Sequence, residues 1–396
     1  MPPTDYDSTT AEELRDLGSV KWTMFPDMIG AFVAEMDFGL APPVSQALHT
    51  TLDRSLTGYL PPELSSRMAE ATAAWCLDNY GWDVPARWVH PVPDVIAALE
   101  IAITKYSPAG SKIIVPTPAY MPFLFVPKSH DREVIEVPSI EVDGHWQMDL
   151  AGIAQAFDDG GHLLILCNPH NPLGTVATRE EMLAIAGLVQ AKGGRVFSDE
   201  IHAPLVFKGS THIPYASVSA EAAAHTITAT SASKAWNLAG LKCAQVIISN
   251  DADEEHWQTF GFMASHGASN LGVVGNTAAY LSGRKWLQDV MEYLDGNRRL
   301  LGELLAEHLP AVKYAAPEGT YIAWLDFRDC DIEGDLAEFF RTEAGVAVSD
   351  GVACGAVGAG FARFVFAMPR PLLREAIERM GAALRRRDDA ELSKAS

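Results

Sequence analysis

The chain has 396 residues, of which 48% are hydrophobic and 20% are charged. This length and composition are typical of a globular protein of two or three domains, and they exclude a disordered, collagen-like or small disulfide-stapled chain. Lys and Arg number 30 against 51 Asp and Glu, so the net charge is −21, which opposes binding to nucleic acid or to an anionic membrane surface.

The cysteines favour a reducing compartment. There are five, scattered and without a C-x-x-C pair, which argues against both a disulfide framework and a zinc site. The N-terminal segment is acidic and lacks the apolar core of a signal peptide, and the longest apolar runs have the length of a strand. We therefore expect a soluble, cytoplasmic protein with no metal and no membrane span.

From about residue 94 the chain alternates short β-branched runs with helical patterns. Helices are predicted over 94–106 and 179–192. Strands are predicted over 112–115, 133–137, 162–166, 194–198, 225–230 and 244–249. Near-continuous apolar strands separated by helices predict an α/β domain whose mostly parallel sheet is covered on both faces.

After about residue 283 the pattern changes. One long helical pattern covers 284–309, and strand-like runs and a helix ending near Arg387 follow it. This indicates a smaller α+β domain. We expect an N-terminal segment that packs with the small domain, then the large domain, then the small C-terminal domain, over residues 1–45, 46–283 and 284–396.

Two charged residues follow predicted strands of the large domain. Lys234 lies in the small, hydroxyl-rich loop SASKAWNLAG after the strand 225–230. Taken alone, it reads as a surface lysine. Asp199 ends the strand 194–198, where a carboxylate is either a cap for the next helix or a buried functional group. Both residues are therefore placed at the carboxyl edge of the sheet, where sites in such folds lie.

Two further features have ordinary structural explanations when taken singly. The stretch CNPHNPLG fixes Asn168 and Asn171 in a turn after the strand 162–166, and Asn-Pro pairs are usually turn chemistry. Arg363 lies within an apolar strand-like run, where a salt bridge is the ordinary explanation.

Together these residues favour pyridoxal phosphate chemistry on an amino acid. The cofactor needs a lysine amine to hold its aldehyde as an imine and to move the Cα proton. A carboxylate keeps its pyridine nitrogen protonated, and an amide donates to its phenolate oxygen. An arginine binds the substrate carboxylate with two parallel hydrogen bonds.

Nearly the whole chain resembles the fold-type I, class I/II aminotransferase-like enzymes, and within them the MalY/PatB group of cystathionine β-lyases. The stretches NPHNP, SDEIH and S-x-S-K with N-x-A-G-L occur in order, and MDF followed by GY points to the lyase group. The resemblance implies a fold-type I architecture, pyridoxal 5′-phosphate as cofactor, an amino-acid substrate and a place in methionine biosynthesis.

The resemblance also implies roles for individual residues. Lys234 is expected to form the Schiff base and Asp199 to pair with the pyridinium nitrogen. Asn171 is expected to contact the phenolate oxygen and the substrate, and Arg363 the α-carboxylate. The other cofactor contacts implied are Tyr120 on the ring face, Pro93, Asp94, Val95, Ser231 and Ser233 at the phosphate, and Tyr59 at the phosphate of the neighbouring subunit of a homodimer.

Three positions depart from the pattern of many aminotransferases. His202 stands where a Tyr is common and is expected to meet the phenolate oxygen. Lys242 replaces an Arg and is expected to meet the phosphate as a point charge. Asp94 places an acid near the phosphate, where a small residue is common, and its side-chain direction is open.

The residues alone leave the reaction open. Loss of the Cα proton leads either to transamination or, when Cβ carries a thiolate leaving group, to elimination. The resemblance favours elimination from L-cystathionine or a related S-substituted cysteine, with a class I/II aminotransferase as the alternative. A transcription regulator and a fold that has lost its cofactor are further alternatives, which the charge and the intact residue set oppose. Four aromatic residues are candidates for an apolar substrate pocket, with core packing as the alternative: Trp22, Phe25, Phe38 and Trp236.

Overall fold

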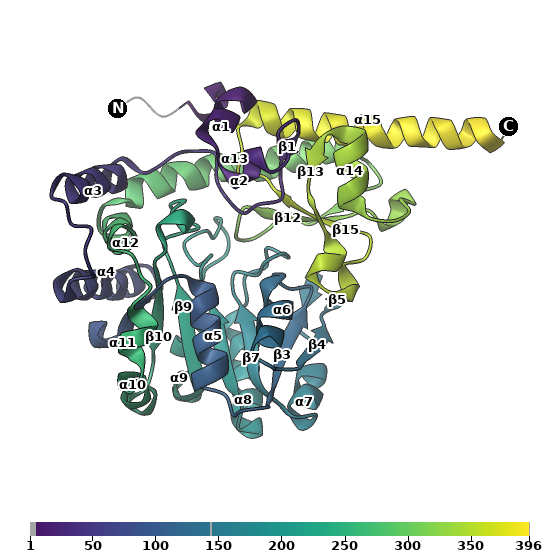
Figure 1. Cartoon of the computed structure of the whole chain (residues 1–396). Coiled ribbons are helices and arrows are strands. Elements are labelled where there is room, and N and C mark those ends of the chain that lie inside the picture. Colours follow the sequence, from purple (N-terminus) through teal and green to yellow (C-terminus); the bar gives the residue numbers. More distant parts are fainter. Residues whose placement is uncertain (1–4, 143–144, 396) are drawn as a thin grey trace.

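In the computed structural model, which describes residues 5–142 and 145–395, a large domain lies below a smaller one in the view of Figure 1. Residues 1–4 of the predicted N-terminal segment lie outside the described range. Among the described residues, no helix combines the length and apolar character needed to cross a membrane.

The large domain is built on a seven-stranded sheet of order β2-β10-β9-β8-β7-β3-β4. Only β10 runs antiparallel to its neighbours, so the predicted mostly parallel α/β sheet is confirmed. Its strands are β2 (Val89–Val92), β3 (Lys112–Thr117), β4 (Val134–Pro138), β7 (Gly161–Cys167), β8 (Arg195–Asp199), β9 (Thr226–Thr230) and β10 (Ala244–Ile248).

Helices bury both faces of this sheet. One face packs against α5 (Val95–Lys105), α6 (Pro122–Ser129) and α10 (Asp251–Gln258), the other against α7 (Leu150–Asp158), α8 (Arg179–Lys192) and α9 (Ala220–His225). The bounds of α8 are those predicted, because Thr178 and Glu181 form a capping box and Gly193 ends the helix at φ +63°. The flank holds α3 (Pro42–Asp53), α4 (Pro62–Tyr80), α11 (Gly261–Ser265) and α12 (Asn270–Ser282).

The small domain follows the long helix α13 (Arg284–His308), which the sequence predicted as one helical pattern. Its four-stranded sheet has the order β11-β12-β15-β14, with bounds Lys313–Tyr314, Ile322–Asp326, Phe361–Val365 and Ser349–Asp350. Helices α14 (Leu336–Ala344) and α15 (Arg370–Ala395) cover it, and α15 extends beyond the predicted end near Arg387. In Figure 1, α15 projects past the rest of the domain.

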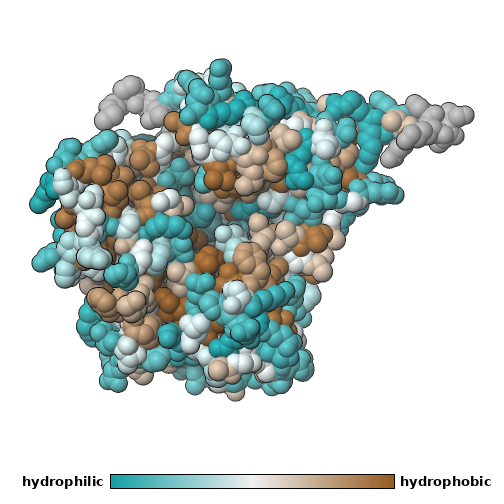
Figure 2. Space-filling model, in the orientation of Figure 1, coloured by the Kyte–Doolittle hydropathy of each residue, from teal (hydrophilic) through white to brown (hydrophobic). Residues whose placement is uncertain are grey.

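The N-terminal segment contacts the small domain through a short parallel strand pair, β1 (Ile29–Gly30) with β13 (Val346–Ala347). Helices α1 (Ala11–Leu17) and α2 (Val20–Thr23) precede it. A hairpin of β5 (Ile140–Val142) and β6 (His145–Gln147) reaches from the large domain toward the small one. Figure 2 shows a hollow between the two domains, and the residues that line it form the site described next.

Candidate active site

A cavity of about 460 Å³ lies at the carboxyl edge of the large sheet, under residues of the small domain. Strand β8 ends in Asp199, β9 leads into the loop of Lys234, and β7 leads into the turn that holds Asn171. Arg363 enters from β15 of the small domain. The cavity is therefore the place where four residues predicted from separate motifs meet.

Lys234, which is half-buried, and Asp199, which is buried, lie at the centre of the cavity. Burial lowers the pKa of Lys234 to about 8, with the Arg363 charge acting in the same direction. Burial raises the pKa of Asp199 to about 7, against the opposing effects of a hydrogen bond from Ile201 N (3.1 Å) and of the Lys234 charge. An amine with a lowered pKa beside a carboxyl with a raised pKa is typical of a reactive site.

Arg363 is buried and held on one edge. Its Nε donates to Asn171 Oδ1 (3.0 Å), and its Nη1 donates to the carbonyl oxygen of Phe32 (2.8 Å) and to Ser349 Oγ (3.5 Å). Within the described residues these bonds use Nε and Nη1, which leaves the Nη2 edge for an anion in the cavity. A buried guanidinium whose other contacts are neutral oxygens fits the binding of a carboxylate.

His202 lines the same cavity in the neutral form, because burial holds its pKa well below the usual range. Its Nδ1 is buried and has no hydrogen-bond partner among the described residues. A buried polar atom without a partner indicates a site that a ligand completes. Tyr120 also lines the cavity, edge-on to Phe123 at 5.4 Å between ring centroids.

One end of the cavity is formed by the start of α5. Asp94 caps this helix by accepting from Ala97 N at 2.8 Å, so its side chain is engaged at the helix end. Lys242 Nζ lies 2.9 Å from Asp94 Oδ2, and both side chains are partly exposed. Pro93, Val95 and Ser233 line the same end. The first N–H groups of a helix and a nearby cation suit a phosphate dianion.

Two predicted site residues lie outside the cavity lining. Ser231 is buried and its hydroxyl donates to the Cys243 carbonyl (2.8 Å). Tyr59 is exposed on the flank of the large domain. Trp22, Phe38 and Trp236 lie in the hydrophobic core, and Phe25 packs edge-on against Phe32 outside the lining.

The sequence analysis gave no role to the residues 32–34, which precede the MDF motif. Phe32, Val33 and Ala34 line the cavity, and Ala34 accepts hydrogen bonds from Lys234 Nζ (3.0 Å) and Tyr321 OH (2.9 Å). These contacts are made by backbone carbonyls, which leave no signature in the residue types. Met121 and Ser349 were missed as well and lie beside Tyr120 and Arg363 respectively.

Known proteins resemble this chain over nearly its whole length. The family model described as "Aminotransferase class I and II" matches residues 28–380. A cystathionine beta-lyase of Corynebacterium glutamicum is 39% identical over 377 residues, 94% of this chain and 98% of that protein. Among solved structures, a putative PLP-dependent beta-cystathionase from Corynebacterium diphtheriae is 41% identical with a TM-score of 0.90, covering 95% of this chain and 98% of that one. Cystalysin from Treponema denticola, whose structure contains pyridoxal 5′-phosphate, is 29% identical with a TM-score of 0.89, covering 96% and 99%.

Proposed function

The chain belongs to the class I and II aminotransferase family, and on that premise we propose that it is a pyridoxal 5′-phosphate-dependent carbon–sulfur β-lyase. Its substrates are L-cystathionine or related S-substituted cysteines, and its products are a thiol, pyruvate and ammonia. The observation that carries the proposal is the meeting of Lys234, Asp199 and Arg363 in one cavity. The relatives named as cystathionine beta-lyase and beta-cystathionase support elimination rather than amino transfer.

The cavity residues fit this cofactor. His202 Nδ1 is a buried atom without a partner among the described residues, and burial raises the pKa of Asp199. A protonated ring nitrogen beside that carboxyl would favour its charged form. Bound pyridoxal phosphate withdraws electrons from Cα of an amino acid, so that the Cα proton is lost more easily and a thiolate at Cβ can be expelled. Lys234 would hold the aldehyde carbon and Asp199 the pyridine nitrogen.

Lys234 is the base of the proposed reaction. A pKa near 8 leaves a useful fraction of neutral amine at neutral pH, so the nitrogen can accept the Cα proton. The C–S bond then breaks, the electron pair leaves with sulfur, and water releases pyruvate and ammonia. Asp199 would keep a proton on the pyridine nitrogen, because two opposite charges in a buried site stabilise each other.

Arg363 and Asn171 orient the substrate. The free edge of the guanidinium would bind the α-carboxylate. Asn171, whose Oδ1 accepts from Arg363 Nε, lines the cavity, and its N–H₂ group would donate to the bound molecule. Tyr120 and neutral His202 line the cavity. Tyr120 would pack on the ring face, and His202 would donate to an oxygen of the bound group. The other end of the cavity is lined by the residues that would hold the phosphate, namely Pro93, Asp94, Val95, Ser233 and Lys242.

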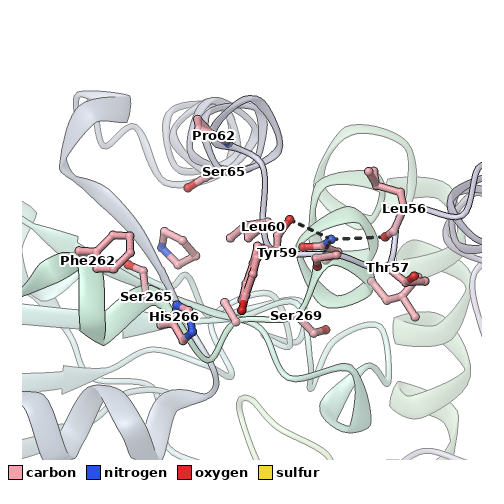
Figure 3. A pocket seen from close by; sticks show the side chains of 15 residues that line it. Leu56, Thr57, Tyr59, Leu60, Pro62, Ser65, Phe262, Ser265, His266 and Ser269 are labelled. Carbon is pink, nitrogen blue, oxygen red and sulfur yellow. Dashed lines mark hydrogen bonds between the residues drawn. The ribbon is translucent and has the colours of Figure 1, made fainter.

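We propose a homodimer, in which Tyr59 reaches the phosphate of the neighbouring subunit. Tyr59 is 87% exposed and Phe262 is 80% exposed, which is unusual for large aromatic side chains on one flank. Both line a second hollow of about 840 Å³. Figure 3 shows the Tyr59 side chain pointing into this hollow, with Phe262 and His266 on one side. Asn270 Nδ2 holds the Tyr59 loop by donating to the Gly58 carbonyl (2.9 Å).

The proposed enzyme acts in the cytoplasm, and release of homocysteine from cystathionine would place it in methionine biosynthesis. The test is a panel of L-cystathionine, L-cystine, an S-alkyl cysteine and L-aspartate, each assayed for thiol, for pyruvate and for amino transfer to a keto acid. We expect equal amounts of pyruvate and thiol from L-cystathionine and the S-alkyl cysteine, pyruvate with an equal amount of persulfide from L-cystine, and no product from Lys234→Ala. Amino transfer without pyruvate would instead establish the aminotransferase alternative.

A further inference from the structure

The residues that follow β1 lie across the cavity, and residues 32–37 are here called the covering segment. Its Phe32 carbonyl accepts from Arg363 Nη1 at 2.8 Å. Its Ala34 carbonyl accepts from Lys234 Nζ at 3.0 Å. The backbone of one short segment therefore touches both cationic side chains to which the proposed function gives a chemical role.

A buried ion pair holds the far end of the covering segment. Lys21 in α2 is fully buried and its Nζ lies 2.8 Å from Asp37 Oδ2, whose side chain is 3% exposed. The same ammonium donates to the carbonyls of Glu35 (3.3 Å) and Ala367 (3.0 Å), so each of its three N–H groups has an acceptor. The other oxygen of Asp37 accepts from Trp22 Nε1 at 2.9 Å.

A second contact ties the covering segment to the loop of Lys234. Asn237, three residues after that lysine, donates from Nδ2 to the Met36 carbonyl (2.9 Å) and accepts from Met36 N (3.0 Å). Asn237 has φ +59°, a left-handed conformation that asparagine tolerates better than most residues. The segment and the lysine loop thus keep a fixed relation to each other.

The chemistry of the ion pair indicates positioning rather than stability. Burying two charges carries a desolvation cost that well-packed apolar side chains of the same volume avoid. Apolar side chains, however, would not bond to the Glu35 carbonyl and so would not fix the course of the backbone between residues 34 and 37. The Lys21 ammonium fixes this course, because it bonds to the Glu35 carbonyl and to the Asp37 carboxylate at the same time.

We propose that the Lys21–Asp37 ion pair positions the covering segment, and through it the amine of Lys234, for the reaction. Neither residue lines the cavity, so both act at a distance, as positioning residues. When the Lys234 nitrogen is not bonded to cofactor, the Ala34 carbonyl accepts one of its protons and fixes where the nitrogen lies. The inference rests on the proposed function only in taking Lys234 as the reacting amine.

The test uses the double variant Lys21→Met/Asp37→Leu, which removes both charges and leaves neither unpaired. The matched control is Arg195→Met/Asp253→Leu, which removes an ion pair of 2.6 Å at the opposite end of β8 from Asp199. If the double variant does not fold, Asn237→Gly replaces it. Glycine suits the positive φ and removes both side-chain bonds to Met36.

The first readout is the pH dependence of Lys234 acetylation in the full-length chain without cofactor, followed by peptide mass spectrometry. The charged groups that act on this amine are Arg363, Glu35 and Asp199, with neutral His202 beside them, and all remain in the variant. Loss of the Ala34 acceptor disfavours the protonated amine, so we expect the midpoint to fall by about 0.5 to 1 pH unit. The control should keep the wild-type midpoint.

The second readout is kcat against KM in the holoenzyme. We expect kcat to fall by about 10²-fold, and by a larger factor than KM rises, because a displaced amine hinders the step after binding. A midpoint that is unchanged, or that rises toward the ordinary lysine value because water enters, overturns the inference, as does a wild-type kcat. If the wild type forms no pyruvate from any thioether, the proposed function fails, while the acetylation midpoint still decides this inference.

Discussion

Arg363 Nε donates to Asn171 Oδ1 at 3.0 Å, a buried contact that joins the two domains. Asn171 follows β7 of the large domain, and Arg363 lies in β15 of the small domain. The residue proposed to bind the substrate carboxylate is thus oriented by a residue proposed to meet the cofactor. The position of one domain relative to the other is therefore part of the substrate site.

Replacing Asn171 by alanine tests this contact. The variant leaves a buried Nε–H without its acceptor, which costs about 1 to 3 kcal/mol, so we expect KM for the amino acid to rise roughly 10-fold or more. Arg363→Lys should be more harmful, lowering kcat/KM by about 10²-fold, because an ammonium cannot present the planar fork. Steady-state kinetics measures both. A larger KM for Asn171→Ala than for Arg363→Lys would show that the guanidinium is not the anchor.

The Lys242–Asp94 pair predicts opposite effects of two substitutions on cofactor affinity. Asp94→Asn keeps the cap of α5 and frees the Lys242 ammonium from its partner, so binding should tighten. Lys242→Met should weaken cofactor binding, because it removes the ammonium. Both side chains are partly exposed, so each change should be about 2- to 5-fold in Kd and should shrink in high salt. Absorbance titration with pyridoxal phosphate checks this, and shifts of the same sign would contradict it.

The raised pKa of Asp199 makes the stability of the cofactor-free chain depend on pH. Because the folded chain keeps a proton up to about pH 7 that the unfolded chain loses near pH 4, this group lowers the free energy of unfolding as the pH rises across that window. The full effect is on the order of 4 kcal/mol. Asp199→Asn removes it.

Urea unfolding of both chains between pH 4 and 8 measures the effect as a difference. Burial lowers the pKa of His170 to about 4, so this group raises the free energy of unfolding as the pH rises, opposite to Asp199. His170 is present in both chains, so its effect cancels in the difference between them. The advantage of the wild type over Asp199→Asn should therefore be largest near pH 4 and decline toward pH 7. Parallel stability curves would show that Asp199 titrates normally.

Mixing two inactive variants tests the proposed role of Tyr59. Tyr59→Ala and Lys234→Ala should each lose most activity, for different reasons. In a mixed dimer one site receives Lys234 from one subunit and Tyr59 from its partner, so unfolding and refolding the two together should restore up to about a quarter of wild-type activity. A chain carrying both substitutions, mixed with wild type in the same way, is the control. No recovery on mixing, with a dimer seen by sedimentation, would place Tyr59 outside the neighbouring site.

The sequence predicted which residues meet in the cavity. Lys234, Asp199 and Asn171 follow adjacent parallel strands, so knowing the strands was enough to bring them together. The sequence pattern singled out Arg363 as a charge within an apolar run. Only the resemblance predicted that it reaches the same site, because no periodicity relates β15 to the large sheet. The helix α12 was not predicted, since the glycines in NLGVVGNT resemble a loop; a Cβ at Gly272 would lie 2.3 Å from the Leu241 carbonyl, so close packing requires the glycine.

The covering segment could not be predicted for a different reason. Its contacts to Lys234 and Arg363 are made by carbonyl oxygens, which every residue type has. The phosphate contact predicted for Ser231 stays a prediction, and the sequence did not indicate that its hydroxyl donates to the Cys243 carbonyl. Which partner a carbonyl or hydroxyl group bonds to depends on three-dimensional packing within a few ångströms, and the spacing of residues in the sequence does not encode that packing.

The most direct test of the account is borohydride reduction of the holoprotein, followed by proteolysis and mass spectrometry. Reduction makes the bond between the cofactor and its lysine permanent, so the modified peptide identifies the residue. We predict the pyridoxyl group on the peptide that contains Lys234, at one group per chain. A label on another lysine, or none on a chain that has bound the cofactor, would contradict the account.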